Sequence, residues 1–384
     1  PLIILEFANN HMGKKKLYEA MVDEFSDIQS EYRDFRFSIK LQYRDLDSFI
    51  HPKFKGSDHT GVKRFESTKV SIDEWSSRID YAISKGFSVG CTPFDEVSVT
   101  EVLKDSRFSF LKIGSCSFND WPFLEKIREE LDNKNKSTHI IASTGGMSLE
   151  IIDKVVSFLK KSTNLNLTLM HCMANYPCSI SNQNLSWIRT LSQRYQTAIG
   201  FSTHEDGDEE YSGAYAYCNG ATIFEKHVVS SIATTVNAYS SNPNQIRRWL
   251  NQIMNAEKYI GSEEKRVKEF TNEKKYLDSF RRGVYTGKDM PKGHISHDDV
   301  YMAFPRQEGQ LTANEWSGFM RYDLDTSLES HEPVTSNLIT IQDTRTKIDE
   351  IRLFVKDLLR KTNIVIEKGA RLEISQHYGL ERYD

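Results

Sequence analysis

The chain has 384 residues, of which 38% are hydrophobic and 27% are charged, and its formal net charge at pH 7 is -4. This composition is typical of a globular protein with one large core and room for a smaller second unit. The negative net charge provides no basic surface for nucleic acid, and no apolar run approaches the roughly 18 residues of a membrane-spanning helix. We therefore expect no nucleic-acid partner and no membrane partner.

The number of cysteines and the first residues of the chain are typical of a protein of a reducing compartment. The five cysteines form no Cys-x-x-Cys pair, and an odd number favours free thiols in a reducing compartment over a disulfide framework. The apolar run 2–5 follows the first residue directly, which leaves no room for a signal peptide. We therefore predict a cytoplasmic protein without a zinc site built from cysteines.

Strand-like apolar runs alternate with helix-like stretches up to about residue 262. Such alternation is typical of an α/β fold in which helices cover a parallel sheet. Eight repeats predict a closed (β/α)8 barrel, the TIM barrel. The predicted strands are 2–8, 35–42, 87–94, 109–115, 138–145, 166–174, 196–204 and 221–229.

The predicted helices carry their own boundary signals. Ser71 and Glu74 have the spacing of a capping box, and Gly86 ends the same helix. Apolar residues between these limits recur at helical spacing and predict a face that packs on the sheet. They are Ile72, Trp75, Ile79, Ala82 and Ile83, and the pattern recurs at Leu149, Ile152, Val155, Val156 and Leu159.

Each of the eight runs ends on a polar or charged residue at the same relative place. A charge inside a run such as 110–114 would be costly if simply buried, so it must be paired, bound to a ligand or carried at a strand end. The carboxyl ends of the strands hold the active site of a (β/α)8 barrel. The residues that we expect around one catalytic bowl are Glu6, Lys40, Thr92, Lys112, Ser143, His171, His204 and His227.

After the barrel, the sequence predicts a linker, a small β domain and a C-terminal extension. A charged stretch is typical of a solvated helix or linker, and short β-prone runs around Pro291-Lys292-Gly293 predict a small β domain. An amphipathic helix with Ile351 and Leu358 follows, and residues 376–380 are typical of an entry into a further domain. The predicted boundaries are 1–262 for the catalytic barrel, 263–280 for the linker, 281–330 for the β domain and 331–384 for a C-terminal extension.

The strand ends lie in eight short motifs that run in order along about 220 residues. The motifs are Glu6 with Asn10-His11-x-Gly13, Lys40-x-Gln42, Thr92-Pro93-Phe94-Asp95, Lys112-Ile113-Gly114-Ser115, Ser143-Thr144-Gly145, His171-Cys172 with Tyr176-Pro177, Gly200-x-Ser202-x-His204 and Glu225-Lys226-His227. One such motif is a weak signal. Together and in this order, they resemble the sialic acid synthase (N-acetylneuraminate synthase) family.

The resemblance implies a barrel followed by a small antifreeze-like (SAF) β domain at 281–330. It implies an enzyme that condenses phosphoenolpyruvate with an open-chain amino sugar, giving phosphate and a 2-keto-3-deoxy sugar acid of the nonulosonic, sialic-acid-like type. The cofactor would be a divalent metal, Mn²⁺ or else Mg²⁺ or Co²⁺. Family members are domain-swapped homodimers, in which the small domain of one subunit closes the barrel of the other.

Phosphoenolpyruvate carries a carboxylate and a phosphate, so its site needs fixed cations and neutral donors. Lys40 and Lys112 fit the cation role, although a lysine at a strand edge also commonly snorkels to solvent. Tyr176 would contact the sugar by resemblance, or is simply a half-buried tyrosine before a proline. The resemblance also implies that four hydroxyl side chains donate hydrogen bonds to phosphoenolpyruvate: Thr92, Ser115, Ser143 and Ser202.

His204 and His227 end neighbouring strands of the predicted barrel, so two imidazoles can share one metal ion. A two-histidine site leaves positions open for water and substrate, as catalysis requires. The alternative is a pair of hydrogen-bonded core histidines. Glu6 would complete the catalytic set, either by stabilising a cationic centre or by taking a proton from water.

Three departures from the family pattern lie on the sugar side. Ser117 stands where the family usually has glutamate, residues 228–244 replace an Arg and Gly-Pro-Asp run, and Phe304 replaces an arginine, with Arg306 nearby. We therefore expect an acceptor other than N-acetylmannosamine, contacted by the neutral replacements. These are Ser117, Asn237, Tyr239, Ser240 and Phe304.

Two rival functions fit the same barrel. A synthase of the 3-deoxy-octulosonate type would share the reaction, but it needs an additional Arg or Lys cluster for a phosphorylated sugar, and the sequence shows none. A catalytically silent sugar-binding barrel would account for the missing sugar contacts. It would not account for retaining Lys40, Lys112, Glu6 and both histidines.

Overall fold

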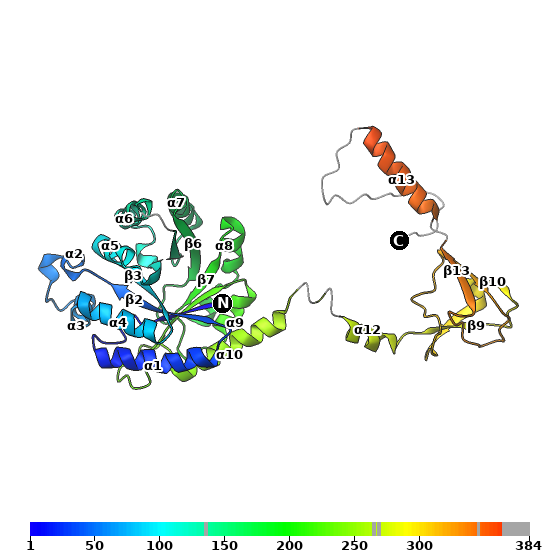
Figure 1. Cartoon of the computed structure of the whole chain (residues 1–384), viewed down its shortest axis with the longest axis horizontal. Coiled ribbons are helices and arrows are strands. Elements are labelled where there is room, and N and C mark those ends of the chain that lie inside the picture. Colours follow the sequence, from blue (N-terminus) through cyan, green and yellow to red (C-terminus); the bar gives the residue numbers. More distant parts are fainter. Residues whose placement is uncertain (134–136, 263–265, 267–269, 344–345, 363–384) are drawn as a thin grey trace. The chain divides into compact units, whose positions relative to one another are not determined.

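The computed structural model describes residues 1–133, 137–262, 266, 270–343 and 346–362. The chain divides into two compact units, Pro1–Gly261 and Ser262–Asp384. The first unit is a closed barrel of eight parallel strands in sequence order, surrounded by helices (Figure 1), which confirms the predicted barrel. Its strands are β1 (Leu2–Glu6), β2 (Arg36–Tyr43), β3 (Ser88–Pro93), β4 (Phe108–Ile113), β5 (Thr138–Ser143), β6 (Leu165–Cys172), β7 (Ile199–Thr203) and β8 (Ile223–His227).

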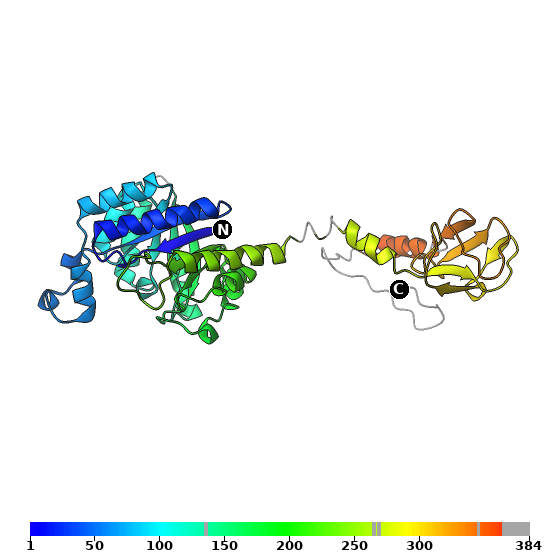
Figure 2. The ribbon, with the colours of Figure 1, turned by 90° about the horizontal axis from the view of Figure 1, so that it is seen from below.

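Helices connect and cover these strands, and every strand ends within two residues of its predicted end. Helices α1 and α10 lie side by side along the outside of the barrel (Figure 2). Every helix of the described residues is too short or too polar to cross a membrane. The helices of this unit are α1 (Lys15–Glu31), α2 (Leu46–Phe49), α3 (Thr60–Ser67), α4 (Ile72–Ser84), α5 (Glu96–Lys104), α6 (Trp121–Asp132), α7 (Leu149–Leu159), α8 (Trp187–Tyr195), α9 (Ser212–Cys218) and α10 (Pro243–Ile260).

Helix α4 shows how local sequence sets an element. Ser71 and Glu74 form the predicted capping box, and Gly86 follows the helix with a φ of +90°, a left-handed conformation that glycine adopts without strain. Trp75, Ile79 and Ala82 are buried against the sheet as predicted. Ile83 was expected on the same face, but its side chain is 41% exposed because it lies one position, about 100°, around the helix from Ala82. The side chain of Ile72 lies outside the described residues.

Glycine makes space at the bottom of the barrel. A Cβ atom on Gly90 of β3 would collide with the aromatic ring of Phe110 on β4. Phe110 is buried with Ile4, Ile141, Met170 and Ile223, so its ring cannot move aside without disturbing this cluster. Gly90 therefore allows a large ring to fill the barrel interior.

Gly90→Ala is expected to lower the free energy of unfolding of the barrel by about 1–3 kcal/mol, because overpacking forces side chains off their preferred rotamers. Thermal denaturation of the full chain measures the effect. Gly61→Ala is the matched control, since its Cβ would meet the ring of His59, an exposed side chain that can move, at 3.4 Å and the ring of Phe65 at 3.8 Å, an ordinary van der Waals distance. Equal stability of both variants and the parent would show that the ring of Phe110 is not confined.

The second unit contains two small antiparallel sheets. One has the strand order β10 (Gly293–Ile295), β12 (Met320–Leu324) and β13 (Ile339–Asp343), and the other pairs β9 (Gly283–Thr286) with β11 (Val300–Ala303). Its core includes Val334 and Ile339, so the β unit extends past the predicted boundary at 330 because β13 pairs with β12. The unit also contains α12 (Thr271–Asp278) within the predicted linker and the predicted amphipathic helix, α13 (Thr346–Lys361). The predicted entry into a further domain at 376–380 lies outside the described residues.

Candidate active site

The barrel strands present an apolar layer and, above it, a polar layer. Side chains two residues apart on a strand lie on the same face, so a residue that follows an inward apolar residue by two positions also points inward. The apolar layer contains Ile4, Phe110, Ile141, Met170 and Ile223. Two positions further along the same strands stand Glu6, Lys112, Ser143, Cys172 and Glu225.

The polar layer lines a cavity of about 380 Å³. The predicted metal ligands, the predicted phosphoenolpyruvate-binding side chains, Glu6 and Tyr176 all line it, so the structure brings these ten residues together. Their chemical roles stay predictions. The set comprises Glu6, Lys40, Thr92, Lys112, Ser115, Ser143, Tyr176, Ser202, His204 and His227.

His171 was expected in the same bowl, and this expectation is wrong. Its Nε2 atom donates a hydrogen bond to the carbonyl of Gln183 at 2.6 Å, its ring stacks on Phe201, and it does not line the cavity. The neighbouring residue Cys172 lines the cavity instead, because adjacent strand residues point to opposite faces. For the same reason Lys226 points outward, where it pairs with buried Glu205 at 2.8 Å.

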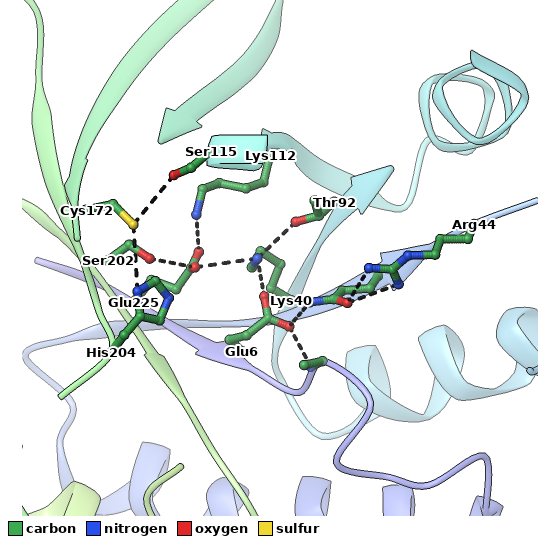
Figure 3. A network of polar contacts seen from close by, with 12 residues as sticks. Glu6, Lys40, Arg44, Thr92, Lys112, Ser115, Cys172, Ser202, His204 and Glu225 are labelled. Carbon is green, nitrogen blue, oxygen red and sulfur yellow. Dashed lines mark hydrogen bonds and ion pairs between the residues drawn. The ribbon is translucent and has the colours of Figure 1, made fainter. Parts of the chain in front are cut away.

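Glu225 is the centre of a buried polar network (Figure 3). One carboxylate oxygen is 2.7 Å from Lys112 Nζ, and the other is 3.5 Å from Lys40 Nζ and accepts a hydrogen bond from Ser202 at 3.0 Å. Burial alone would raise the pKa of Glu225, but Lys112 and Lys40 lower it well below its usual range. Burial lowers the pKa of Lys112 against the attraction of Glu225. The carboxylate therefore remains charged and holds both lysines in the cavity.

Glu6 forms the second carboxylate of the network. It pairs with Lys40, accepts a hydrogen bond from the backbone of Ala8 at 2.5 Å and one from Gln42 at 3.4 Å. Lys40 also donates to Thr92 at 2.9 Å. Burial raises the pKa of Glu6, and Lys40 only partly offsets this effect. Glu6 is thus a stronger proton acceptor than an exposed glutamate.

The serines of the fourth and fifth strand ends are arranged for a ligand in the cavity. Ser115 accepts a hydrogen bond from the backbone of Gly145 at 3.1 Å and lies 3.6 Å from Cys172 Sγ. A Cβ atom on Gly145 would lie 2.7 Å from Ser115 Oγ, so the close approach requires glycine. The hydroxyl of Ser143 is buried without a hydrogen-bond partner among the described residues. Such a hydroxyl is normally satisfied by a ligand or by water.

The two predicted metal ligands lie side by side, with ring centroids 5.3 Å apart. A carbonyl can only accept, so His204 donates from Nδ1 to Met173 at 2.9 Å and carries its lone pair on Nε2. His227 Nδ1 is buried without a partner in the described part of the chain. Burial lowers the pKa of His204 to about 4 and that of His227 well below its usual range. Both imidazoles are therefore neutral, the form that binds metal, and they fit a divalent ion.

The residues expected to replace the family's sugar contacts are only partly in the cavity. Tyr239 lines it, with its ring 5.2 Å from Tyr176. Ser117, Asn237 and Ser240 do not line it, which corrects the expectation for them. Asn237 and Ser240 instead bind Asn10 at 3.0 Å each, a contact that ties the loop after β8 to the loop after β1. Phe304 belongs to the second unit, and Arg306 there donates to the carbonyl of Asp278 at 3.1 Å.

Sequence reasoning missed several lining residues. Glu225 had a usable signal, because it stands two positions before His227 and therefore on the same face of β8. Cys172 likewise stands two positions after Met170 and therefore on the same face of β6. Arg44 and Arg64 also line the cavity, and they lie outside the strands, where no periodicity points inward.

A closed parallel barrel with this convergent polar mouth defines the class as a (β/α)8-barrel enzyme. Residues 38–265, more than half of the chain, match the model of the NeuB family, and the protein belongs to that family. The resemblance seen in the sequence is thereby confirmed.

Named relatives are enzymes that make sialic-acid-like sugars. The chain is 26% identical to the N,N'-diacetyllegionaminic acid synthase of Campylobacter jejuni over 77% of this chain and 87% of that protein. It is 28% identical to the pseudaminic acid synthase of the same organism over 77% and 84%. Among solved structures, a Chromobacterium violaceum protein described as spore coat polysaccharide biosynthesis protein E is 40% identical, with a TM-score of 0.81 over 88% of this chain and 99% of that chain.

Proposed function

We propose that this protein condenses phosphoenolpyruvate with an open-chain amino sugar, with a divalent metal, to give phosphate and a 2-keto-3-deoxy sugar acid of the nonulosonate type. The observation that carries the proposal is the cavity itself, which gathers buried lysines, hydroxyl donors, a carboxylate with a raised pKa and two neutral histidines. Membership of the NeuB family, whose named relatives are sialic, legionaminic and pseudaminic acid synthases, supports it.

Lys40 and Lys112 would bind the carboxylate and phosphate of phosphoenolpyruvate. Both ammonium groups lie in the cavity and are held there by Glu6 and Glu225. The unpartnered hydroxyl of Ser143, together with Ser115, Ser202 and Thr92, would donate hydrogen bonds to the same anion. Charge-assisted contacts of this kind are about twice as strong as neutral ones.

His204 and His227 would hold the metal, His204 through its Nε2 atom. Among the described residues no third His, Cys, Asp or Glu joins them in a metal-binding group, so water and substrate would complete the coordination. The ion, when bound, supplies Lewis-acid polarisation of the sugar aldehyde. Tyr176, whose ring centroid is 4.1 Å from that of His204, would cover the sugar beside it.

In the proposed reaction, C3 of phosphoenolpyruvate forms a bond to the aldehyde carbon, the aldehyde oxygen takes up a proton to become a hydroxyl, and C2 becomes cationic. Water adds to C2 and loses a proton, and the tetrahedral intermediate expels phosphate to leave the keto group. We propose that Glu6 accepts that proton, and its raised pKa supports this role over purely electrostatic stabilisation. Lys40, paired with Glu6, would stabilise the carboxylate before the proton arrives.

The silent sugar-binding barrel is disfavoured by the buried charges. A buried ion pair such as Lys112–Glu225 contributes little net stability compared with well-packed apolar residues. A protein that only bound a neutral sugar would have no physical need for two such lysines and two neutral histidines in one cavity.

The proposal includes further expectations from the family. We propose that the small β unit is an antifreeze-like domain, that the protein is a homodimer and that the acceptor differs from N-acetylmannosamine. The cysteines Cys91, Cys116, Cys172, Cys178 and Cys218 are all free, which supports an enzyme of the reducing cytoplasm.

The proposal is tested by phosphate release from phosphoenolpyruvate across a panel of N-acylated amino sugars, with and without Mn²⁺. We expect release with at least one sugar, strict dependence on added metal and slower turnover of N-acetylmannosamine than of the preferred sugar. Mass spectrometry should find a product equal to sugar plus pyruvate. No release with any sugar would contradict the proposed reaction, and efficient turnover of N-acetylmannosamine without a preferred alternative would contradict the altered acceptor.

A further inference from the structure

Arg44 is a partly buried cation without a counter-charge. It follows β2 directly, and its guanidinium carbon lies 3.6 Å from the centre of the Phe94 ring and 4.2 Å from that of Phe65. Its terminal nitrogens donate to the amide oxygen of Gln42 at 3.1 and 3.2 Å. No carboxylate of the described residues approaches it within 4.0 Å, and its Nε atom is buried without a hydrogen-bond partner.

Several other arginines of the barrel unit are paired with a carboxylate, whereas exposed arginines such as Arg64 and Arg189 have no such partner among the described residues. Arg107, Arg194, Arg247 and Arg248 each lie within 2.8 Å of a carboxylate oxygen. Arg78 also lacks a carboxylate, but it lies outside the cavity and donates to the carbonyl of Gly13 at 2.7 Å. Burial lowers the pKa of Arg44 to about 10, which means that the partly buried position destabilises the charged guanidinium. A guanidinium that lines a cavity without a carboxylate partner can bind an anionic ligand through two parallel hydrogen bonds.

A second arginine shares this part of the cavity. Arg64 of α3 is exposed, lines the same cavity and contributes to lowering the pKa of Arg44, so the two positive charges are near each other. The lining residues carry four cations, the two arginines with Lys40 and Lys112, against the carboxylates of Glu6 and Glu225. These six side chains sum to a charge of +2. The two carboxylates pair with the two lysines, so the excess positive charge belongs to the two arginines.

The arginine end and the lysine end of the network are separate. In Figure 3, Lys112, Ser115 and Ser202 gather on one side and Arg44 lies on the other, with Glu6 and Lys40 between them. His204 lies on the same side as Lys112, so the sugar aldehyde would also be held there, and the end of the sugar distant from the aldehyde would extend toward Arg44.

We infer that the acceptor carries an anionic group at the end distant from its aldehyde, and that Arg44 and Arg64 bind this group. The inference rests on the proposed function and narrows its substrate class to acidic amino sugars, either phosphate monoesters or carboxylates. The planar fork of Arg44 matches both anions, and the rings of Phe65 and Phe94 hold it in place. The arginine cluster that the sequence did not show is thus assembled by the fold from residues twenty positions apart.

Non-reacting open-chain analogues test the inference by calorimetry on the full chain with Mn²⁺ and saturating phosphoenolpyruvate. The probes are N-acetylmannosaminitol, its 6-phosphate and its 6-carboxylate. We expect one of the charged analogues to bind about ten- to a hundredfold more tightly than the neutral one. The better of the two charged probes identifies the anion.

Arg44→Gln should remove most of this advantage, and Arg64→Gln should reduce it, because each removes one positive charge. Arg44→Lys should retain part of it, since a point charge replaces the fork. Arg189→Gln, an exposed arginine on α8, is the matched control and should leave all affinities unchanged.

Equal affinity for the charged and neutral analogues would overturn the inference. So would an Arg44→Gln variant that loses affinity for phosphoenolpyruvate while it still prefers the charged analogue. Should Arg44→Gln fail to fold, Arg64→Gln decides alone, and an undiminished preference there overturns the inference for the pair. Failure of the proposed function is distinguishable, because it appears as no binding of phosphoenolpyruvate and no phosphate release with any acceptor.

Discussion

His204→Ala and His227→Ala are each expected to abolish metal-dependent phosphate release while leaving the barrel folded. Loss of a group that merely supports a metal ligand costs about 10–100-fold in metal affinity or activity. Loss of one of the two proposed protein ligands should cost at least about 100-fold in Mn²⁺ affinity. Calorimetric titration with Mn²⁺ measures this directly, without reference to turnover.

The two variants should differ in stability. His227 Nδ1 has no hydrogen-bond partner among the described residues, so its removal breaks no hydrogen bond of the protein. Removing the imidazole of His204 leaves the partly buried carbonyl of Met173 without its donor, which costs about 0.5–1.5 kcal/mol. His51→Ala, at an exposed histidine outside the cavity, is the control for metal binding. Unchanged Mn²⁺ affinity in both variants would show that the histidines are structural.

Lys112→Met is expected to destabilise the protein and to weaken phosphoenolpyruvate binding by separate mechanisms. The variant leaves the buried carboxylate of Glu225 without its closest cation, and breaking a buried ion pair costs about 3–5 kcal/mol. The lost charge-assisted contact should raise KM for phosphoenolpyruvate by about one to two decades, and KM for the sugar much less. Chemical denaturation and steady-state kinetics measure the two effects.

The double variant Lys112→Met/Glu225→Leu separates these effects. Removing both charges should restore much of the stability, because no buried charge is left without its partner, but it should not restore phosphoenolpyruvate binding. Arg247→Gln breaks a surface pair with Glu31 and serves as the control, with an expected cost of about 0–1 kcal/mol. Equal increases in KM for both substrates would place Lys112 away from phosphoenolpyruvate.

Much of the fold and of the candidate site could be predicted because both depend on local periodicity. Apolar runs of strand length that alternate with capped amphipathic helices leave few topologies other than a closed parallel barrel. The polar residues at the carboxyl ends of those runs then converge, since all parallel strands open to the same mouth. Glu6, Lys40 and Lys112 could be placed in one cavity on this basis, and the structure places them there.

Sequence periodicity was therefore enough to give the order of the strands and the strand ends that carry the polar side chains of the candidate site. The three-dimensional fold was needed to place His171 outside the barrel interior and Cys172 inside it, because a polar residue at a strand end does not by itself show which face it occupies. It also decided which loop residues meet, because loops have no period that relates them to the barrel axis. Arg44 and Arg64 are brought together in this way, and the charge that they leave unpaired depends on the absence of a nearby carboxylate among the described residues, a fact of three-dimensional packing.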